Sequence, residues 1–217
     1  MDLTHAAIVV AHPDDEILWF SSLVTRVAHI VICYGAVEAI PERRAQRQRV
    51  IGAYPLPNVE FLDLTEPGAV SGDADAAHQR ELAKLLPPLL AGVTTVFTHN
   101  PWGEYGHLDH RRLNAVIEDL SKKMDFAVYV SSYAARHQLG GVDCALNGGI
   151  GEVVSFPVDE RPIREIFQLY RTAGCWTWTS HWKWPKDESF LRLGEGANLR
   201  PEPFSLHLFD LDAVIRD

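Results

Sequence analysis

The first group of side chains that could do chemistry begins at residue 12, directly after a short apolar run. The motif AHPDDE (residues 11–16) follows Ala6–Val10 and joins one imidazole to three carboxylates. His12 and Asp15 stand three residues apart, so they share one face if a helix begins there. The motif alone is also typical of an ordinary helix start, because proline is favoured at the first helical position and acidic side chains stabilise the first turn.

A second polar motif, HLDH at residues 107–110, repeats this arrangement later in the chain. It follows the apolar run Thr94–Thr98, and His107 and His110 again stand three residues apart. Asp109 is expected to hold the second ring nitrogen of His107 and so fix its tautomer. On its own this motif fits a solvated helix face as well as a site. If the sheet has the commonest doubly wound order, however, the strands before the two motifs are neighbours, and both motifs border the crevice where ligands bind.

Together the two motifs supply the residue types of a catalytic metal site. Two imidazoles and one carboxylate, from His12, Asp15 and His110, make a three-ligand site with one coordination position open, as in catalytic zinc sites. Asp14 and His107 remain beside the ion to move protons. Iron or cobalt fits the same three ligands. The residues therefore predict metal-assisted hydrolysis of an unreactive bond.

The elements that position these motifs are predicted to form a Rossmann-like, doubly wound α/β fold. Repeated strand and helix units with buried, non-alternating strands indicate a three-layer αβα sandwich around a mostly parallel sheet. Strands are expected at Ala6–Val10, His29–Cys33, Val59–Leu62, Thr94–Thr98 and Phe126–Val130. Helices are expected at Ile17–Val27, at residues 42–54, at Leu82–Leu89, where Pro87 and Pro88 kink or end it, and at Leu113–Leu120.

The pattern changes after residue 130. A glycine-rich stretch precedes an expected strand at Val153–Phe156 and an expected helix at Glu160–Arg171, and the tryptophan-rich segment CWTWTSHWKW (residues 175–184) follows. We expect a single domain over residues 1–217, with its core at 1–130 and a C-terminal embellishment at 131–217 that shapes the substrate pocket.

The composition excludes several classes of protein. The 217 residues carry a net charge of -9, and a surface of that sign repels phosphate backbones and anionic lipids. Cys33, Cys144 and Cys175 lack the spacing of a disulfide framework and the context of a nucleophile. The N-terminus lacks the pattern of a signal peptide or a membrane span. We therefore expect a cytoplasmic protein that binds neither nucleic acid nor a membrane.

With these residues in view, the sequence resembles the LmbE-like, or PIG-L, family of zinc-dependent N-deacetylases. The family signature joins A-H-P-D-D-E after the first strand to H-x-D-H after a later one, and both are intact here and in that order. The resemblance runs through most of the chain, and the paired motif is its specific part. It implies hydrolysis of the acetamide of an N-acetylglucosamine-type sugar or sugar conjugate, and the family also contains enzymes that cleave other amides.

The resemblance also implies a role for each matched residue. His12, Asp15 and His110 would bind Zn2+, and Asp14 would be the general base that takes a proton from water. His107, supported by Asp109, would steady the oxyanion and protonate the leaving amine. Tyr105 matches a tyrosine that helps some members to hold the tetrahedral intermediate.

The sequence departs from the family pattern in two places. Many members carry Arg-x-x-Glu in the second helix, whereas this chain has PERRAQRQRVIG without that glutamate, so Arg43 or Arg44 is the loosely matched candidate for binding substrate. Leu108 stands where the family usually has proline. An arginine-rich helix face is more often simply solvated.

Other interpretations remain open at this point. Two histidines and a carboxylate also form the facial triad of Fe(II) oxygenases, and a catalytically silent carbohydrate-binding module would keep the same fold. The tryptophans of 175–184 are expected to pack over the core more than to line a sugar pocket, or to form an interface in a homo-oligomer. His99 is expected to be a satisfied strand-end histidine, and His181 a surface one.

Overall fold

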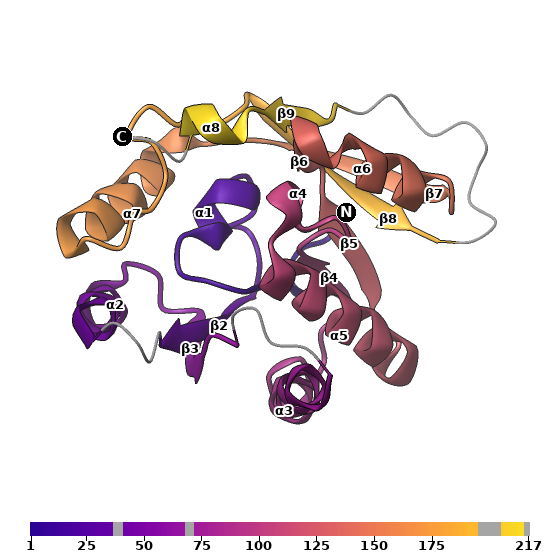
Figure 1. The fold of residues 1–217 in the computed structure, drawn as a ribbon, viewed down its shortest axis with the longest axis horizontal. Coiled ribbons are helices and arrows are strands. Elements are labelled where there is room, and N and C mark those ends of the chain that lie inside the picture. Colours follow the sequence, from indigo (N-terminus) through magenta and orange to yellow (C-terminus); the bar gives the residue numbers. More distant parts are fainter. Residues whose placement is uncertain (37–40, 68–71, 195–204, 215–217) are drawn as a thin grey trace.

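The computed structural model describes residues 1–36, 41–67, 72–194 and 205–214. In this part of the chain, seven strands form one sheet in the order β3-β2-β1-β4-β5-β8-β7 (Figure 1). Strands β1 to β5 run parallel, and β8 pairs antiparallel with both β5 and β7. The predicted mostly parallel α/β sandwich is confirmed. The strands are β1 (Ala6–Val10), β2 (His29–Ala36), β3 (Val59–Thr65), β4 (Thr95–Thr98), β5 (Ala127–Ser131), β7 (Ile150–Pro157) and β8 (Asp187–Leu193).

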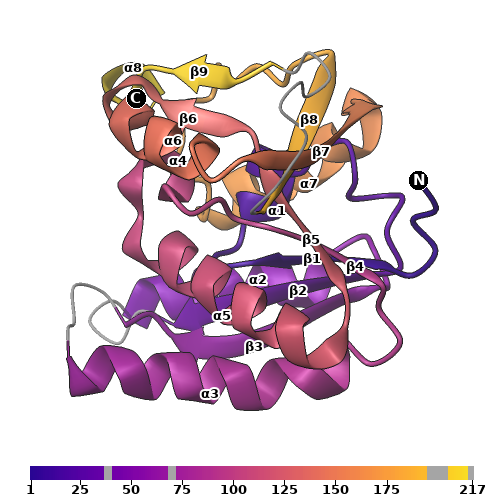
Figure 2. The same cartoon turned by 90° about the vertical axis from the view of Figure 1, so that its right-hand side faces the viewer.

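Helices cover both faces of this sheet (Figure 1). A small second sheet lies at the top of both views, where β5 leads into β6 (Figures 1 and 2). The second sheet pairs β6 (Tyr133–Ala135) in parallel with β9 (His207–Phe209). The helices are α1 (Asp15–Trp19), α2 (Pro41–Ala53), α3 (Asp73–Leu89), α4 (Gly103–Gly106), α5 (Leu108–Met124), α6 (Leu139–Leu146), α7 (Glu160–Ala173) and α8 (Leu211–Val214), with a 3-10 turn at Arg136–Gln138.

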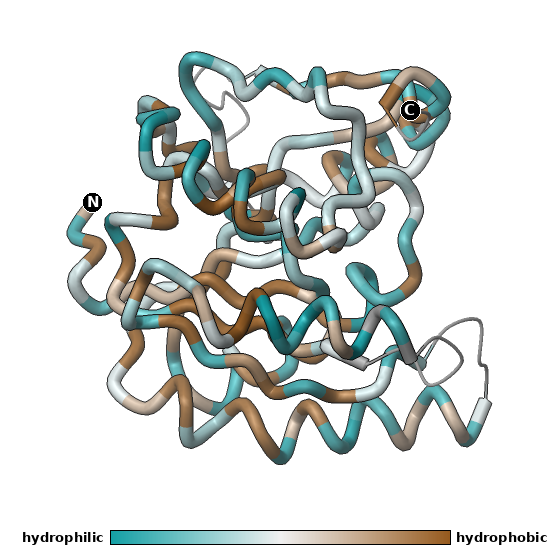
Figure 3. Tube along the Cα trace, turned by 90° about the vertical axis from the view of Figure 1, so that its left-hand side faces the viewer, coloured by the Kyte–Doolittle hydropathy of each residue, from teal (hydrophilic) through white to brown (hydrophobic). Residues whose placement is uncertain are grey.

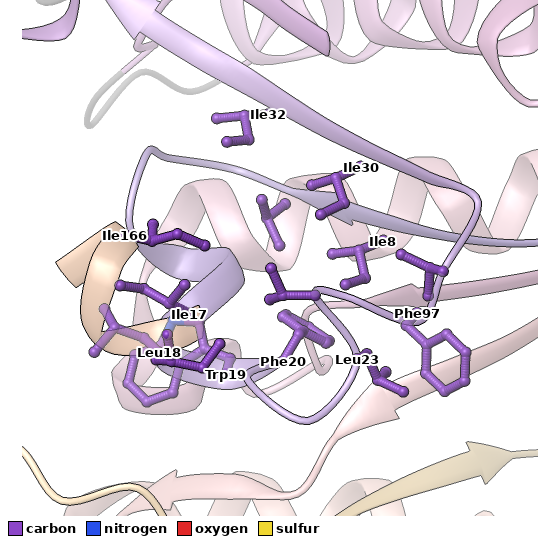
Figure 4. Close-up of a cluster of buried hydrophobic side chains, with 14 of the residues drawn as sticks. Ile8, Ile17, Leu18, Trp19, Phe20, Leu23, Ile30, Ile32, Phe97 and Ile166 are labelled. Atoms are coloured by element: carbon purple, nitrogen blue, oxygen red, sulfur yellow. The ribbon is translucent and has the colours of Figure 1, made fainter. Parts of the chain in front are cut away.

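Strand β1 is buried on both faces, and its side chains divide between two cores. Ile8 and Val10 pack with residues of α1 and α7, whereas Ala7 and Val9 pack with residues of α3 and α5. Figure 4 shows the first cluster, and in Figure 3 hydrophobic residues concentrate along the central strands between the helical layers. Both faces of β1 are apolar, so polar side chains can follow only where the strand has ended. His12 is the second residue after that end.

The first helix is shorter than its apolar spacing predicts. We expected it to extend to Val27, but α1 ends at Trp19 and residues 20–28 form turns. The reason is Glu188 of β8, because its fully buried carboxylate accepts hydrogen bonds from the Ser22 backbone amide at 2.7 Å and from the Ser21 hydroxyl at 2.6 Å. The Ser22 amide is therefore not available to continue the helix, although Val27 is still buried.

Two further elements differ from the sequence pattern. Helix α3 begins at Asp73, nine residues before the predicted start at Leu82, and it ends at Leu89 with Pro87 and Pro88 in its last turn, as predicted. The glycine-rich stretch after residue 138 contains a helix, α6, which no periodic pattern indicated.

The two strands that precede the polar motifs are neighbours. Strand β1 lies between β2 and β4, and Val9 pairs with Thr98, so both strands end at the same edge of the sheet. The first motif begins directly after β1, and the second follows β4 after the short helix α4. The commonest doubly wound order is therefore the one observed, and it brings the two motifs together.

Candidate active site

A cavity of about 340 Å³ lies at the carboxyl ends of β1 and β4. One wall consists of motif residues, and the other comes from α2, the end of β3 and the segment after α7. The lining residues are His12, Pro13, Asp14, Asp15, Gln46, Arg47, Glu66, Tyr105, His107, Gly174, Cys175, Trp176, Thr177 and Trp178.

Asp14 has a left-handed backbone conformation at the start of α1. Its φ of 95° is unusual for a residue with a side chain and costs roughly 1 kcal/mol or more. The Asp14 amide donates to the Glu16 carboxylate at 3.1 Å, which supports this turn. The Asp14 side chain does not cap the helix. Its carboxylate lines the cavity and accepts a hydrogen bond from the Thr177 hydroxyl at 3.4 Å.

Asp15 is the centre around which the predicted ligands gather. Its Oδ2 atom lies 3.3 Å from Nδ1 of His12 and 3.3 Å from Nε2 of His110. The backbone amide of His12 donates to the same oxygen at 2.7 Å, and the Trp19 indole donates to Oδ1 at 2.9 Å. Because each oxygen of Asp15 has a donor, the orientation of the carboxylate is fixed within the loop.

Two separations between these donor atoms suit a tetrahedral metal ion. Zinc bonds of about 2.0–2.1 Å place neighbouring ligand atoms of a tetrahedron roughly 3.3–3.4 Å apart, as observed for the two distances to Asp15 Oδ2. Nε2 of His110 is also a buried nitrogen without a hydrogen-bond partner among the described residues. A buried polar atom of this kind calls for an explanation, and an ion held between His12, Asp15 and His110 supplies one.

Glu104 orients His110 from the side away from the cavity. Its fully buried carboxylate lies 2.8 Å from Nδ1 of His110, so Nε2 is directed towards Asp15. The Ser131 hydroxyl and the backbone amide of Asn100 donate to the other carboxylate oxygen of Glu104, Oε1. Burial alone would raise the pKa of Glu104, but His99 and His110 outweigh this effect and lower it to about 2. Glu104 also has a positive φ of 52°, so the backbone is strained at the residue that fixes His110.

His99 contacts two residues of this site, Asp15 and Glu104. It is fully buried at the end of β4, and its Nε2 accepts a hydrogen bond from the Ala11 amide at 3.0 Å, as predicted for a satisfied strand-end histidine. The same nitrogen also lies 3.3 Å from Asp15 Oδ2, while Nδ1 lies 3.2 Å from Glu104. In the described part of the chain, two groups of donor atoms are close enough together to hold a metal ion: Asp15, His99 and His110 form one, and His12, His107 and His110 form the other.

The two adjacent carboxyl groups of the first motif have opposite pKa shifts. Burial raises the pKa of Asp14 well above its usual range, and the charges of Asp15 and Glu16 raise it further. Burial acts on Asp15 in the same direction, but His110 and His99 outweigh it and hold the pKa of Asp15 well below its usual range. Titratable neighbours with diverging pKa values are typical of an acid–base site. One group stays charged and can bind a ligand, and the other can exchange a proton.

Asp109 does not hold His107 in the way that we expected. Its backbone amide, and not its carboxylate, donates to Nδ1 of His107, at 3.2 Å. The carboxylate instead lies 3.3 Å from Nε2 of His12 and accepts a hydrogen bond from Arg112 at 2.7 Å. The reason is that His107 is the N-cap of α5, where its ring accepts from the first turn of the helix. Because Nδ1 is an acceptor, neutral His107 carries its proton on Nε2.

Tyr105 lies where the predicted site places it, although the path of the chain there is irregular. Its ring lies 5.4 Å from the ring of His107, 5.5 Å from that of His110 and 5.3 Å from that of Trp178. Burial is the main cause that raises the pKa of its hydroxyl, and the charges of Asp15 and Asp14 add to it. Tyr105 therefore stays protonated and can donate a hydrogen bond into the cavity.

Among the described side chains, the arginine that lines the cavity is Arg47, which was not one of the two predicted. Arg44 is 67% exposed at its side chain and lies 3.9 Å from Asp63, and the side chain of Arg43 falls outside the described residues. Arg47, one turn further along α2, lines the cavity, is buried, and donates to the carboxylate of Glu66 and to the backbone oxygen of Gly35. The arginine-rich face is thus solvated at Arg44 and buried at Arg47.

Glu16, the third acid of the first motif, makes the contacts of a structural residue. Glu16 is fully buried, and its Oε1 accepts hydrogen bonds from Tyr54 at 2.6 Å and Tyr170 at 2.8 Å, whereas Oε2 accepts from Asp14. Burial raises the pKa of Glu16 to about 7. Glu16 therefore ties the motif to the end of α2 and to α7.

Some tryptophans of the segment 175–184 pack in the core, and others line the cavity. Trp184 is buried and donates to the backbone oxygen of Ile17, and Trp182 joins the aromatic cluster around Trp19. Trp176 and Trp178 line the cavity. Both interpretations of the segment therefore apply, each to different residues. His181 is exposed, as predicted.

Several cavity or support residues were not predicted from the sequence, and four of them make the contacts described above. Glu104, Arg47, Glu66 and Thr177 lie outside both motifs, and their spacing relative to the motifs carries no helical or strand periodicity. They reach the site through the turn after β4, through α2, through the end of β3 and through the segment after α7. Only the position of Glu104, six residues before His110 in the same connection, could have suggested a link.

Within the described residues, no helix is both long and apolar enough to cross a membrane.

Three solved structures share this fold at low sequence identity. The A40926 pseudoaglycone deacetylase has a TM-score of 0.59 at 13% identity, covering 91% of this chain and 100% of that one. A teicoplanin deacetylase in its zinc-inhibited form has a TM-score of 0.58 at 11% identity (87% and 97%), and a deacetylase–teicoplanin complex has a TM-score of 0.58 at 12% identity (90% and 100%). No curated protein sequence matches this chain.

The family comparison covers both motifs. The model of the PIG-L family, described as GlcNAc-PI de-N-acetylase, matches residues 7–121, which is more than half of the chain. That range includes β1, β4, the two polar motifs and the loops that carry Asp14 and Glu104. On this match, supported by the shared fold, the chain belongs to the PIG-L family.

Proposed function

We propose that this chain is a zinc-dependent N-deacetylase that hydrolyses the acetamide of an N-acetylglucosamine-type sugar or sugar conjugate. The observation that carries the proposal is the approach of His12 Nδ1 and His110 Nε2 to the same oxygen of Asp15, each at 3.3 Å, next to a cavity that His12, Asp14 and Asp15 line. The family description names the same reaction on a sugar lipid, and the similar solved structures act on, or bind, glycopeptide antibiotics by their titles.

The metal would be held by His12 Nδ1, Asp15 Oδ2 and His110 Nε2. Zn2+ bound there would supply a Lewis acid that makes water a nucleophile at neutral pH and polarises a carbonyl oxygen. Fe2+ or Co2+ would suit the same donors. Asp109 and Glu104 fix the opposite ring nitrogens of the two histidines, at 3.3 Å and 2.8 Å, so both rings present a lone pair to the same point.

The other cavity residues divide the proton chemistry. Asp14 takes a proton from water, because its carboxylate lines the cavity and burial raises its pKa, which makes it a stronger base than an ordinary carboxylate. His107 and Tyr105 present Nε2–H and O–H donors that steady the oxygen of the amide as charge develops on it. Asp14 then gives this proton to the nitrogen of the amine as the C–N bond breaks, so the proton count closes, and His107, which lines the same cavity, is the group that would pass it on.

The assay should vary the metal and the substrate together. The purified protein is stripped with a chelator, reloaded with one equivalent of Zn2+, Fe2+ or Co2+, and given N-acetylglucosamine conjugates of an alkyl alcohol, an inositol, a thiol cofactor and a glycopeptide. We expect acetate and free amine in equal amounts from at least one conjugate, and none from the stripped protein. Loaded protein that releases no acetate from any of them would contradict the proposal.

Some sequence predictions remain predictions. They are the cytoplasmic location, the single-domain organisation over residues 1–217, and assembly into a homo-oligomer.

A further inference from the structure

A chain of charged contacts runs from the surface of α3 to the candidate metal ligand His12. Asp75 on α3 accepts from Nε of Arg112 at 2.5 Å, and Nη1 of Arg112 donates to Oδ1 of Asp109 at 2.7 Å. Oδ2 of Asp109 lies 3.3 Å from Nε2 of His12. Figure 2 shows α5, which carries Arg112 and Asp109, lying alongside α3.

This chain becomes more buried towards the cavity. The Asp75 side chain is 29% exposed, that of Arg112 8% and that of Asp109 3%. A carboxylate as buried as Asp109 is stable in its charged form only when it is paired and hydrogen-bonded. Arg112 supplies that pairing, and both Arg112 and His12 keep the pKa of Asp109 low against the effect of burial.

We propose that Arg112 is a positioning residue for the deacetylase site. Arg112 holds the Asp109 carboxylate against His12, and this contact directs Nδ1 of His12 at the metal. The inference rests on the proposed function. Arginine suits this task because its planar guanidinium uses Nε for one carboxylate and Nη1 for another, whereas a lysine has one ammonium and cannot keep the same two directions. Without Arg112, Asp109 would be free to turn from His12 towards water.

A purely structural role is the competing explanation, because Arg112 also joins α5 to α3 through Asp75. A structural brace would change the melting temperature of the metal-free protein and leave the metal affinity of the folded protein unchanged. A positioning role would change the affinity, and it would do so only while Asp109 is present. A double-mutant cycle separates these two explanations.

The experiment measures Zn2+ affinity of full-length protein by competition with a coloured chelator, together with the melting temperature of the metal-free protein. We expect Asp109→Ala to weaken Zn2+ binding about 10–100-fold, the usual effect of losing a partner of a metal-bound histidine. Arg112→Ala, which acts one contact further out, should weaken it about 3–10-fold in the wild type and less than about twofold in the Asp109→Ala background. Arg112→Lys should recover part of the loss.

The control is Arg111→Ala, because Arg111 is the same residue type, is next in the same helix, and is exposed. It should leave the affinity unchanged. The positioning role is overturned if Arg112→Ala lowers only the melting temperature, or if its effect on affinity is the same with and without Asp109. Wild-type protein that binds no Zn2+ at all would overturn the proposed function as well, so the two failures are distinguishable.

Discussion

The two walls of the candidate active site are built differently. On the motif wall, buried partners fix the candidate ligands, because Glu104 and His99 are fully buried and each contacts a ligand or its neighbour. On the opposite wall, Glu66 and Trp176 are only half-buried and belong to connecting segments after β3 and α7. Connecting segments vary more freely than the scaffold that they join. From this difference we propose that the motif wall determines the reaction and the opposite wall the substrate, although Arg47 and Trp178 of the opposite wall are also buried.

The largest expected effect concerns the proton-transfer group of the motif wall. Asp14→Asn keeps the shape of the side chain but removes the general base, so kcat should fall by about 10²–10⁴-fold. Zn2+ affinity should stay within about threefold, because Asp14 is not among the proposed ligands. Steady-state kinetics and metal titration on the same preparation check both statements. A variant that retains most of its kcat would remove Asp14 from the mechanism.

The next effect tests whether the buried support of the motif wall matters. Glu104→Gln places an amide against Nδ1 of His110, which should weaken Zn2+ binding about 10–100-fold. Glu81→Gln, an exposed change on α3, is the matched control and should have no effect. Equal affinities in the two variants would mean that His110 does not depend on Glu104 for its orientation.

A smaller and different effect is expected on the opposite wall. Glu66→Gln removes a charged acceptor from the cavity and weakens the hold on Arg47, so KM should rise about 3–10-fold with kcat nearly unchanged, as for a contact made equally in the ground and transition states. Arg44→Ala, on the exposed part of α2, should change neither constant. If Glu66→Gln lowers kcat and leaves KM unchanged, the two walls do not divide the work as we describe.

The smallest effect concerns a carboxyl group outside the cavity that shapes the loop after α1. Burial raises the pKa of Glu188 above the ordinary glutamate value of 4.5, so the folded state holds this proton more tightly than the unfolded state does. Its contribution to stability is therefore greatest below pH 4.5 and declines as the pH rises towards the folded pKa, by at most about 1.4 kcal/mol per pH unit.

Denaturant unfolding of the metal-free protein between pH 4 and pH 7, roughly the range that a raised carboxyl pKa spans, checks this. The free-energy difference between wild type and Glu188→Gln should shrink with rising pH. A difference that grows with pH would show that the pKa of Glu188 is lowered by folding.

Most of the fold and the motif wall could be predicted from the sequence, for physical reasons. The buried strands are short apolar runs, and the motifs begin where those runs end, so the order of the sheet brings His12 and His110 together. The length of α1 could not be predicted, because it is set by Glu188, more than 160 residues later. The contact of Asp109 with His12 in place of His107 also depends on how α5 is capped, and spacing carries no information about that choice.

The opposite wall was the least predictable part. Arg47 and Arg44 lie on the same helix and are alike in sequence, and only the packing of α2 beside Gly35 and Glu66 decides which of them reaches the cavity. Gly35 is also constrained on the side of β3, because an added Cβ atom would lie 2.3 Å from Oδ1 and 2.9 Å from Cα of Asp63. Such contacts between distant segments leave no periodic signal in the sequence.

The most direct test of the account is an anomalous difference map at the zinc edge from crystals grown with Zn2+. We predict one strong peak at about 2.0–2.2 Å from His12 Nδ1, Asp15 Oδ2 and His110 Nε2, on the side that faces Asp14. A peak bonded to other residues, or no peak in crystals grown at saturating Zn2+, would contradict the claim that these two loops hold the catalytic ion.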